Sequence, residues 1–209
     1  MLSGHGMGDG DRRRSRHDET VALIVQEAWR LAEENGLTAV SVGDLARAME
    51  MRPQSLYTYF ASKHAIYDRM YREGFEELLA RFADLDQAGD GEAADDPTAF
   101  LARAAETFVD FVAERASRYQ LLFQRVVPGF EPTTESYAVA IRALEIMRGW
   151  LRRAGITAER DLYLWRSLLL GLAGEQLAND PGGRRWHNLA GDAARYFVLF
   201  TRSMKESTS

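Results

Sequence analysis

The chain has 209 residues, of which 46% are hydrophobic and 27% are charged, and its formal net charge is −5. This length and apolar content suffice for a small helical domain joined to a larger helical body. The absence of cysteine excludes disulfides, thiolate zinc sites and cysteine nucleophiles. No apolar run approaches the ~18–20 residues that span a bilayer, and residues 1–10 lack an apolar signal core. We therefore expect a cytoplasmic protein with no membrane partner.

The charge is distributed unevenly along the chain. Residues 1–72 carry ten Lys or Arg and ten Asp or Glu, whereas residues 73–209 carry sixteen and twenty-one. Within residues 41–72 the basic residues outnumber the acidic ones by five to three. This weak basic excess predicts a modest electrostatic affinity for nucleic acid from each copy of the chain, so that binding relies on two copies.

The N-terminal segment is predicted to be a disordered basic arm over residues 1–16, which ends in Arg12-Arg13-Arg14-Ser15-Arg16. Two interpretations of this arm remain open. It is either a solvated tail or an arm that reaches phosphates or the adjacent minor groove. The first helix is predicted over residues 18–35, because apolar residues recur there at helical spacing and Gly36 follows as a typical C-terminal signal.

Two short helices are predicted next, one directly after the other. Ser41 and Asp44 have the spacing of a capping box, so the first of them starts at Ser41. Pro53 suits the first turn of the second helix, which is predicted to run to about Tyr59. This second helix is short and rich in hydroxyl and amide groups, which is typical of the helix that a helix-turn-helix places in the major groove.

The residues from Leu56 to Lys63, Leu-Tyr-Thr-Tyr-Phe-Ala-Ser-Lys, and the Ile66 that follows resemble the signature of the tetracycline-repressor family of transcription regulators. The usual pattern there is Leu-Tyr-x-His-Phe-x-x-Lys-x-x-Leu. This chain departs from it with Tyr59 in place of His and Ile66 in place of Leu, and Glu50 stands in the turn where Gly is usual. The resemblance covers residues 17–72 and implies a DNA-binding head, an effector-binding body and a dimer.

The candidate DNA contacts lie on or beside the second short helix, where side chains can donate to phosphates and base edges. They are Ser41, Arg52, Pro53, Gln54, Ser55, Tyr57, Thr58, Tyr59 and Lys63.

A fourth helix is predicted over residues 62–84, long enough to join head and body rigidly, and an acidic loop over residues 84–97 follows it. The body helices are predicted over residues 97–115, 119–126, 137–151, 159–178 and 186–204. No alternating strand pattern is present. The chain is thus predicted to be all-α with about nine helices: a three-helix helix-turn-helix domain over residues 17–62 and a helical effector-binding and dimerisation domain over residues 63–209.

The helix predicted over residues 159–178 is apolar on more than one side, which indicates burial on several sides. It is either the central helix of the body or, together with the last helix, half of a four-helix interface between two copies. We favour the interface because helix-turn-helix proteins read two half-sites as dimers. The candidate interface residues are Leu164, Leu168, Gly171, Ala193, Phe197 and Phe200.

Aromatic residues are frequent on the middle helices, where they either fill the core or line an apolar pocket between helices. The resemblance implies a pocket for a small, largely apolar effector. Its candidate lining is Phe82, Phe108, Phe111, Phe123, Tyr137, Met147, Trp150 and Trp165. Candidate polar contacts are Arg118, Gln124, Arg166, Glu175 and Gln176, and an anionic ligand would need Arg118 or Arg166 turned inward.

No sequence feature predicts an enzyme, a cofactor or a metal site. His64 and Asp68 lie one helical turn apart, which is a weak metal signal, and no serine has a nucleophile elbow. The sequence therefore predicts a ligand-responsive transcription regulator, a repressor, that binds a palindromic operator as a homodimer. The competing interpretation is a helical small-molecule-binding protein that does not regulate DNA, and a helical enzyme is the third.

Overall fold

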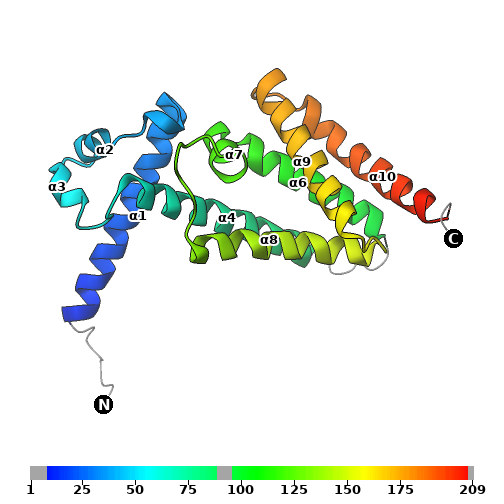
Figure 1. Ribbon diagram of the computed structural model, residues 1–209, viewed down its shortest axis with the longest axis horizontal. Coiled ribbons are helices and arrows are strands. Elements are labelled where there is room, and N and C mark those ends of the chain that lie inside the picture. Colours follow the sequence, from blue (N-terminus) through cyan, green and yellow to red (C-terminus); the bar gives the residue numbers. More distant parts are fainter. Residues whose placement is uncertain (1–8, 89–95, 207–209) are drawn as a thin grey trace, which may run out of the picture.

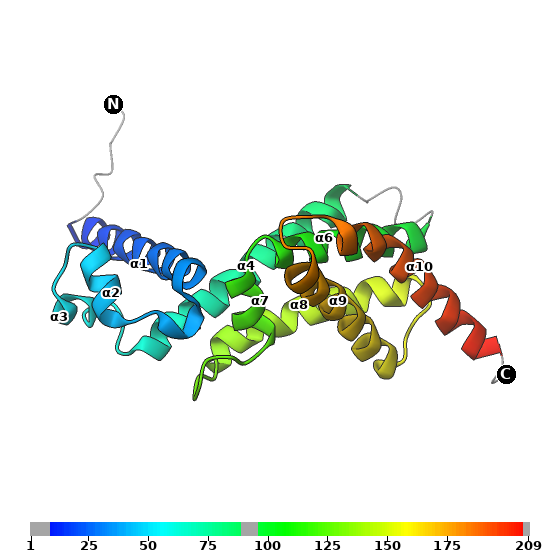
Figure 2. The same cartoon turned by 90° about the horizontal axis from the view of Figure 1, so that it is seen from above.

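The structure is a computed structural model that describes residues 9–88 and 96–206. Over these ranges the chain forms nine α-helices and one 3-10 turn, with no strand, which confirms the predicted all-α fold. The helices are α1 (Asp9–Asn35), α2 (Val42–Ala48), α3 (Pro53–Leu56), α4 (Lys63–Ala88), α6 (Pro97–Ala113), α7 (Ala116–Phe123), α8 (Thr134–Arg153), α9 (Glu159–Asn179) and α10 (Arg185–Glu206), with the 3-10 turn η1 (Leu37–Ala39) after α1. The head, α1 to α3, lies at one end of an elongated molecule (Figures 1 and 2).

The first helix is longer than the sequence predicted. It begins at Asp9, so residues 9–16 of the predicted disordered arm are helical, while residues 1–8 lie outside the described residues. Arginine and glutamate favour helices, and hydrogen bonds between residues one helical turn apart stabilise this extension of α1 toward the N-terminus. The Ser15 hydroxyl donates to Glu19 Oε1 at 2.9 Å, and the Thr20 hydroxyl donates to the Arg16 carbonyl at 2.9 Å.

The two short helices of the head follow their local signals. The Ser41 hydroxyl accepts from the Asp44 backbone N–H at 3.1 Å and donates to Asp44 Oδ2 at 2.5 Å, so it caps α2 as predicted. Pro53 occupies the first turn of α3. The helix itself ends at Leu56 rather than near Tyr59, because the chain then tightens into turns in which the Tyr59 N–H donates to the Leu56 carbonyl at 3.0 Å.

The long helix α4 belongs to both parts of the molecule (Figure 1). The Ser62 hydroxyl caps its start by accepting from the Ala65 N–H at 3.1 Å. One turn later, the buried Tyr67 hydroxyl donates to the Leu37 carbonyl of η1 at 2.6 Å and so ties α4 to the head. The helix continues to Ala88, past the predicted end near residue 84. Its remaining turns pack on the body helices, chiefly α8.

The body has two packed groups of helices. Helix α8 runs beside α4, while α6 packs against both α9 and α10 (Figure 1). Trp150 of α8 joins the two groups, since its ring lies 4.6 Å from Phe82 of α4 and 5.4 Å from Phe100 of α6. Its indole N–H donates to Asp86 Oδ1 at 2.8 Å, so the polar edge of this buried ring is satisfied.

Among residues 9–88 and 96–206, no helix combines the length and the apolar character that crossing a membrane requires.

The turn between α2 and α3 generates a stability prediction. Glu50 has φ of 52°, in the left-handed region that favours glycine. We expect Glu50→Gly to raise the free energy of unfolding by roughly 0.5–1 kcal/mol, because relief of backbone strain exceeds the entropic cost of glycine. Urea denaturation at a fixed protein concentration measures this change. Glu50→Ala is the matched control, since it removes the charge but keeps the Cβ, and equal gains in both variants would contradict a strain effect.

Candidate functional site

The segment from Arg52 to Thr58 presents most of the predicted DNA contacts to solvent. Arg52, Pro53, Gln54, Ser55, Tyr57 and Thr58 are exposed, while Leu56 between them is buried, on a helix that packs against α2. Within the described part of the chain, the side chains of Arg52, Gln54 and Tyr57 have no hydrogen-bond or ion-pair partner. The Thr58 hydroxyl instead donates to the Ser55 carbonyl at 2.7 Å. The head therefore offers a short ridge of unused donors.

Three other predicted contacts are half-buried and already engaged within the head. The Ser41 hydroxyl is the cap of α2. The Lys63 ammonium donates to the Thr38 carbonyl at 3.1 Å and lies over the ring of Tyr67. The Tyr59 ring stacks on His17 of α1, with centroids 5.0 Å apart. These residues support the exposed ridge, and Lys63 would have to leave its carbonyl partner to reach a phosphate.

The body contains a cavity of about 100 Å³ between α4, α7, α8 and α9. Of the predicted effector residues, the structure places Phe123, Tyr137 and Met147 in its lining. The other five lie fully buried in the core, where neighbouring rings and helices fill the space around them: Phe82, Phe108, Phe111, Trp150 and Trp165. The cavity is smaller than the ~300 Å³ of typical ligand pockets, so a drug-sized ligand requires it to widen.

Sequence reasoning missed Tyr71 and Phe75, which form the α4 wall of this cavity. Phe75 was counted in the apolar stripe of α4, but Tyr71 was not, because it lies beside that stripe. Among the predicted polar contacts, Arg166 lies at the cavity. Arg118 does not, because it is buried and bonded to the Phe111 carbonyl and to the carboxylates of Glu77 and Glu114.

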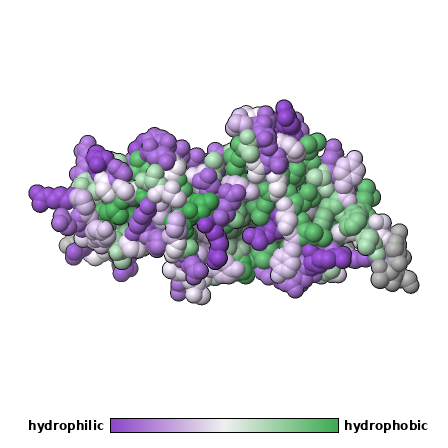
Figure 3. Space-filling view, turned by 45° about the horizontal axis from the view of Figure 1, so that its top comes forward, coloured by the Kyte–Doolittle hydropathy of each residue, from purple (hydrophilic) through white to green (hydrophobic). Residues whose placement is uncertain are grey.

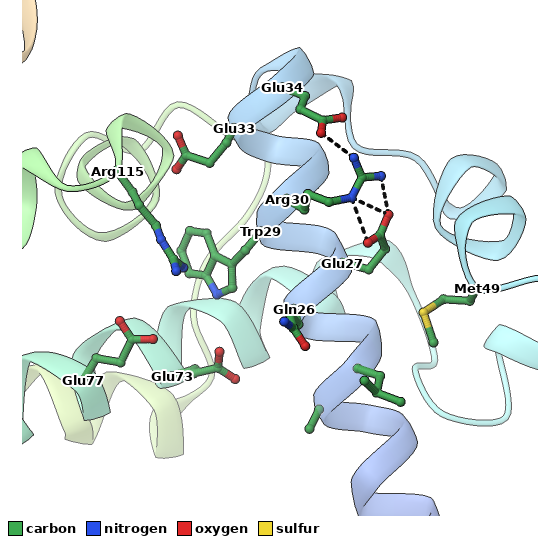
Figure 4. Close-up of a pocket in the computed structure, with 12 residues that line it drawn as sticks. Gln26, Glu27, Trp29, Arg30, Glu33, Glu34, Met49, Glu73, Glu77 and Arg115 are labelled. Carbon is green, nitrogen blue, oxygen red and sulfur yellow. Dashed lines mark hydrogen bonds and ion pairs between the residues drawn. The ribbon is translucent and has the colours of Figure 1, made fainter. Parts of the chain in front are cut away.

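A larger groove of about 840 Å³ separates the head from the body (Figure 4). Helix α1 forms one side, and α4 and the start of α7 form the other. Five carboxylates line it: Glu27, Glu33, Glu34, Glu73 and Glu77. Burial raises the pKa of Glu73 above its ordinary value. The groove is bridged at one end, where the Ser117 hydroxyl of α7 donates to Glu33 of α1. Nothing in the sequence pattern indicated this contact between α1 and α7.

The outer face of α9 and α10 is apolar and exposed, and Figure 3 shows extensive apolar surface over this part of the body. All six predicted interface residues reach the surface. Leu164 and Phe200 are 45% and 55% exposed and Gly171 is also exposed, while Leu168, Ala193 and Phe197 are half-buried. Tyr163, Leu189, Tyr196 and Met204 are further large, exposed side chains on these two helices.

His64 and Asp68 do not form a metal site in this structure. The ring of His64 lies beside Phe130, with centroids 6.1 Å apart. The Asp68 carboxylate accepts from the Thr133 N–H at 2.7 Å and from the Ser136 hydroxyl at 2.8 Å, and so it caps α8. Among the residues that the structure describes, no group of three or more His, Cys, Asp or Glu side chains could hold a metal ion.

The head matches a known family. Residues 24–70 match the sequence profile described as "Bacterial regulatory proteins, tetR family". The chain is 28% identical over 154 residues to the uncharacterised HTH-type transcriptional regulator YobS of Bacillus subtilis (strain 168), covering 73% of this chain and 76% of YobS. The head of the chain is therefore similar to the DNA-binding domains of the tetR family. These relatives are transcription regulators and not enzymes, which agrees with the predicted class.

Solved structures extend the likeness to the body. The tetR-family regulator PfmR from Thermus thermophilus is 26% identical, with a TM-score of 0.63 over 84% of this chain and 97% of PfmR. The regulator FadR from Bacillus subtilis, solved in complex with stearoyl-CoA, is 16% identical, with a TM-score of 0.63 over 85% of this chain and 97% of FadR. The FadR comparison supports the fold over the 85% of the chain that it covers.

The unused donors of the head generate a DNA-binding prediction. Gln54 can bond an adenine edge at two points, so Gln54→Ala should relax base preference by roughly 1–3 kcal/mol at one position. Arg52→Ala should instead weaken binding to all DNA sequences similarly. It should also reduce the slope of log affinity against log salt concentration by about one. Competition binding over a salt series measures both effects. Arg125→Ala, in the exposed loop after α7, is the control, and unchanged binding by both head variants would refute the assignment.

Proposed function

We propose that the chain is a regulator of the tetR family, a dimeric repressor that binds a palindromic operator and is released by a small effector. The observation that carries the proposal is the exposed ridge of Arg52, Gln54 and Tyr57, whose donors have no partner among the described residues. Two such ridges about one DNA turn apart, ~34–36 Å, would read the two half-sites. The ridge from Arg52 to Thr58 is proposed as the direct contact, with Ser41, Tyr59 and Lys63 positioning it. Such a protein acts in the cytoplasm, where bacterial DNA lies.

The dimer is proposed to form through the apolar faces of α9 and α10. Leu164 and Phe200 are large apolar side chains on the surface, and they belong to a contiguous patch on two adjacent helices. Contiguous apolar patches of this kind mark association surfaces. Because the two helices lie at the end of the molecule away from the head (Figure 2), their pairing leaves both heads free to contact DNA.

The effector site is proposed to be the cavity lined by Phe123, Tyr137 and Met147. The FadR complex supports ligand binding by a body of this fold. The cavity shares α4 with the head, so a ligand that widens it displaces the helix on which the head is mounted. A ligand that binds the displaced form better by about 1–3 kcal/mol lowers DNA affinity about 5–150-fold.

Selection of bound duplexes from a random pool tests the proposed function. We expect a two-fold symmetric sequence to be enriched, and its binding to weaken steeply with salt. A helical ligand-binding protein without DNA activity is the competing candidate. It would be supported if no sequence were enriched and no salt-dependent DNA binding were found at micromolar concentrations of the folded protein.

The exposed face of α9 and α10 generates a prediction for the dimer. Phe200→Glu places an unpaired charge in the proposed interface, which costs several kcal/mol on association. We expect light scattering to show a monomer near micromolar concentration while circular dichroism shows unchanged helix content. Phe200 suits this test better than Phe197, because Phe197 packs on Trp165 within the monomer, 5.4 Å between ring centroids. Leu23→Glu, at an exposed position on α1, is the control, and a wild-type monomer at high concentration would refute the dimer.

A further inference from the structure

The cavity between α4, α7, α8 and α9 is lined by a tyrosine whose hydroxyl has no partner among the described residues. Tyr71 is 7% exposed and lines the cavity, yet its hydroxyl makes no hydrogen bond to any described residue. Other tyrosines of the core are satisfied: Tyr67 donates to the Leu37 carbonyl, and Tyr119 donates to the Leu170 carbonyl at 3.2 Å. The Tyr71 hydroxyl is therefore a donor that a ligand in the cavity can use.

A second unused donor lies at the same cavity. Arg166 of α9 lines it and has no hydrogen bond or ion pair with any residue that the structure describes. Its charge acts on Tyr71, because Arg166 is among the groups that influence the pKa of that phenol. Arg118, the other arginine of this region, is fully bonded to the Phe111 carbonyl and to two carboxylates. The structure thus supplies a guanidinium and a phenol with no acceptor to bind.

The protonation states of both groups favour an acceptor ligand. Burial raises the pKa of Tyr71 to about 12, so the phenol keeps its proton and donates at neutral pH. Arginine is always charged and bonds carboxylates at two points. No carboxylate of the described residues lines this cavity, in contrast to the groove between head and body, which has five. A cationic ligand would therefore find no counter-charge among the lining residues, although the Asp68 carboxylate beyond the lining also acts on Tyr71.

The rest of the cavity wall is apolar. It is formed by Phe75, Leu78, Leu122, Phe123, Ala140, Ile141, Ala143, Leu144 and Met147, together with the half-exposed ring of Tyr137. The volume of about 100 Å³ is of the order needed for a single ring or a short alkyl chain. Because Tyr137 and Arg166 are exposed, the cavity can be entered without unpacking the buried core.

We propose that the effector is a monocarboxylate with a compact apolar body, an aryl or short-chain alkyl acid, whose carboxylate binds Arg166 and the Tyr71 hydroxyl. The apolar body occupies the space between Phe75, Phe123 and Met147. This inference rests on the proposed function and names the chemical class of its effector. It also assigns specificity, because the neutral amide of the same acid leaves the guanidinium without its counter-charge.

Calorimetry on the full-length protein tests the inference with matched pairs of ligands. The acids are benzoate, phenylacetate, hexanoate and octanoate, and each is compared with its primary amide. We expect at least one acid to bind roughly tenfold or more tightly than its amide, because a charge-assisted hydrogen bond is lost in the amide. Arg166→Gln should remove this preference, and Tyr71→Phe should weaken binding of the acid several-fold.

Arg142→Gln is the control variant, because Arg142 is also exposed in the body but does not line the cavity. It should bind the acid as the wild type does. The inference is overturned if no acid binds better than its amide, or if Arg166→Gln keeps the preference. Operator selection separates this result from the proposed function. If the protein enriches an operator but does not distinguish acids from their amides, only the proposed effector class is refuted. If the protein binds an acid but no DNA, the proposed function as a regulator is refuted.

Discussion

The buried guanidinium of Arg118 is the interaction on which the arrangement of head and body depends. It is 3% exposed and bonds the Phe111 carbonyl and Glu114 at the end of α6, Glu77 of α4, and the face of the Phe111 ring. Burial of this charge is tolerated because several acceptors surround it, and removal of a partner would leave a charge uncompensated. Arg118 thereby fixes α7 on α4 and α6. The neighbouring Ser117 then reaches Glu33 of α1, so the position of the head follows from the position of α7.

Helix α4 brings the proposed effector cavity close to the head. Tyr67 is bonded to the head, and Tyr71, one helical turn further along, lies in the body cavity. Phe130 contacts both rings, with centroid distances of 5.9 and 6.3 Å. Packed interiors rearrange between discrete states rather than deforming continuously. In the proposed mechanism, a shift of Tyr71 would have to travel only about 6 Å of helix to reach the residue that ties α4 to the head.

The head could be predicted from sequence because its structure is determined by local chemistry. The cap at Ser41, the proline at residue 53 and the left-handed turn at Glu50 each act within a few residues. The apolar face of α9 and α10 was also predictable, since a helix with two apolar stripes needs two neighbours. The cavity was not. Whether a ring such as Phe108 or Tyr71 meets another helix or a gap depends on the packing of helices distant in sequence, which the helical period does not encode.

The early start of α1 lowers the conformational entropy that its N-terminal arginines would lose on binding a phosphate. The stack of His17 on Tyr59 anchors the helix beside the exposed ridge from Arg52 to Thr58, so Arg13, Arg14 and Arg16 are exposed on a helix that is already formed. A flexible arm loses roughly 1–2 kcal/mol of backbone conformational entropy for each residue that it orders on binding. Residues already held in a helix do not incur that loss again. Any phosphate that these arginines contact is therefore bound with little entropic penalty from the polypeptide.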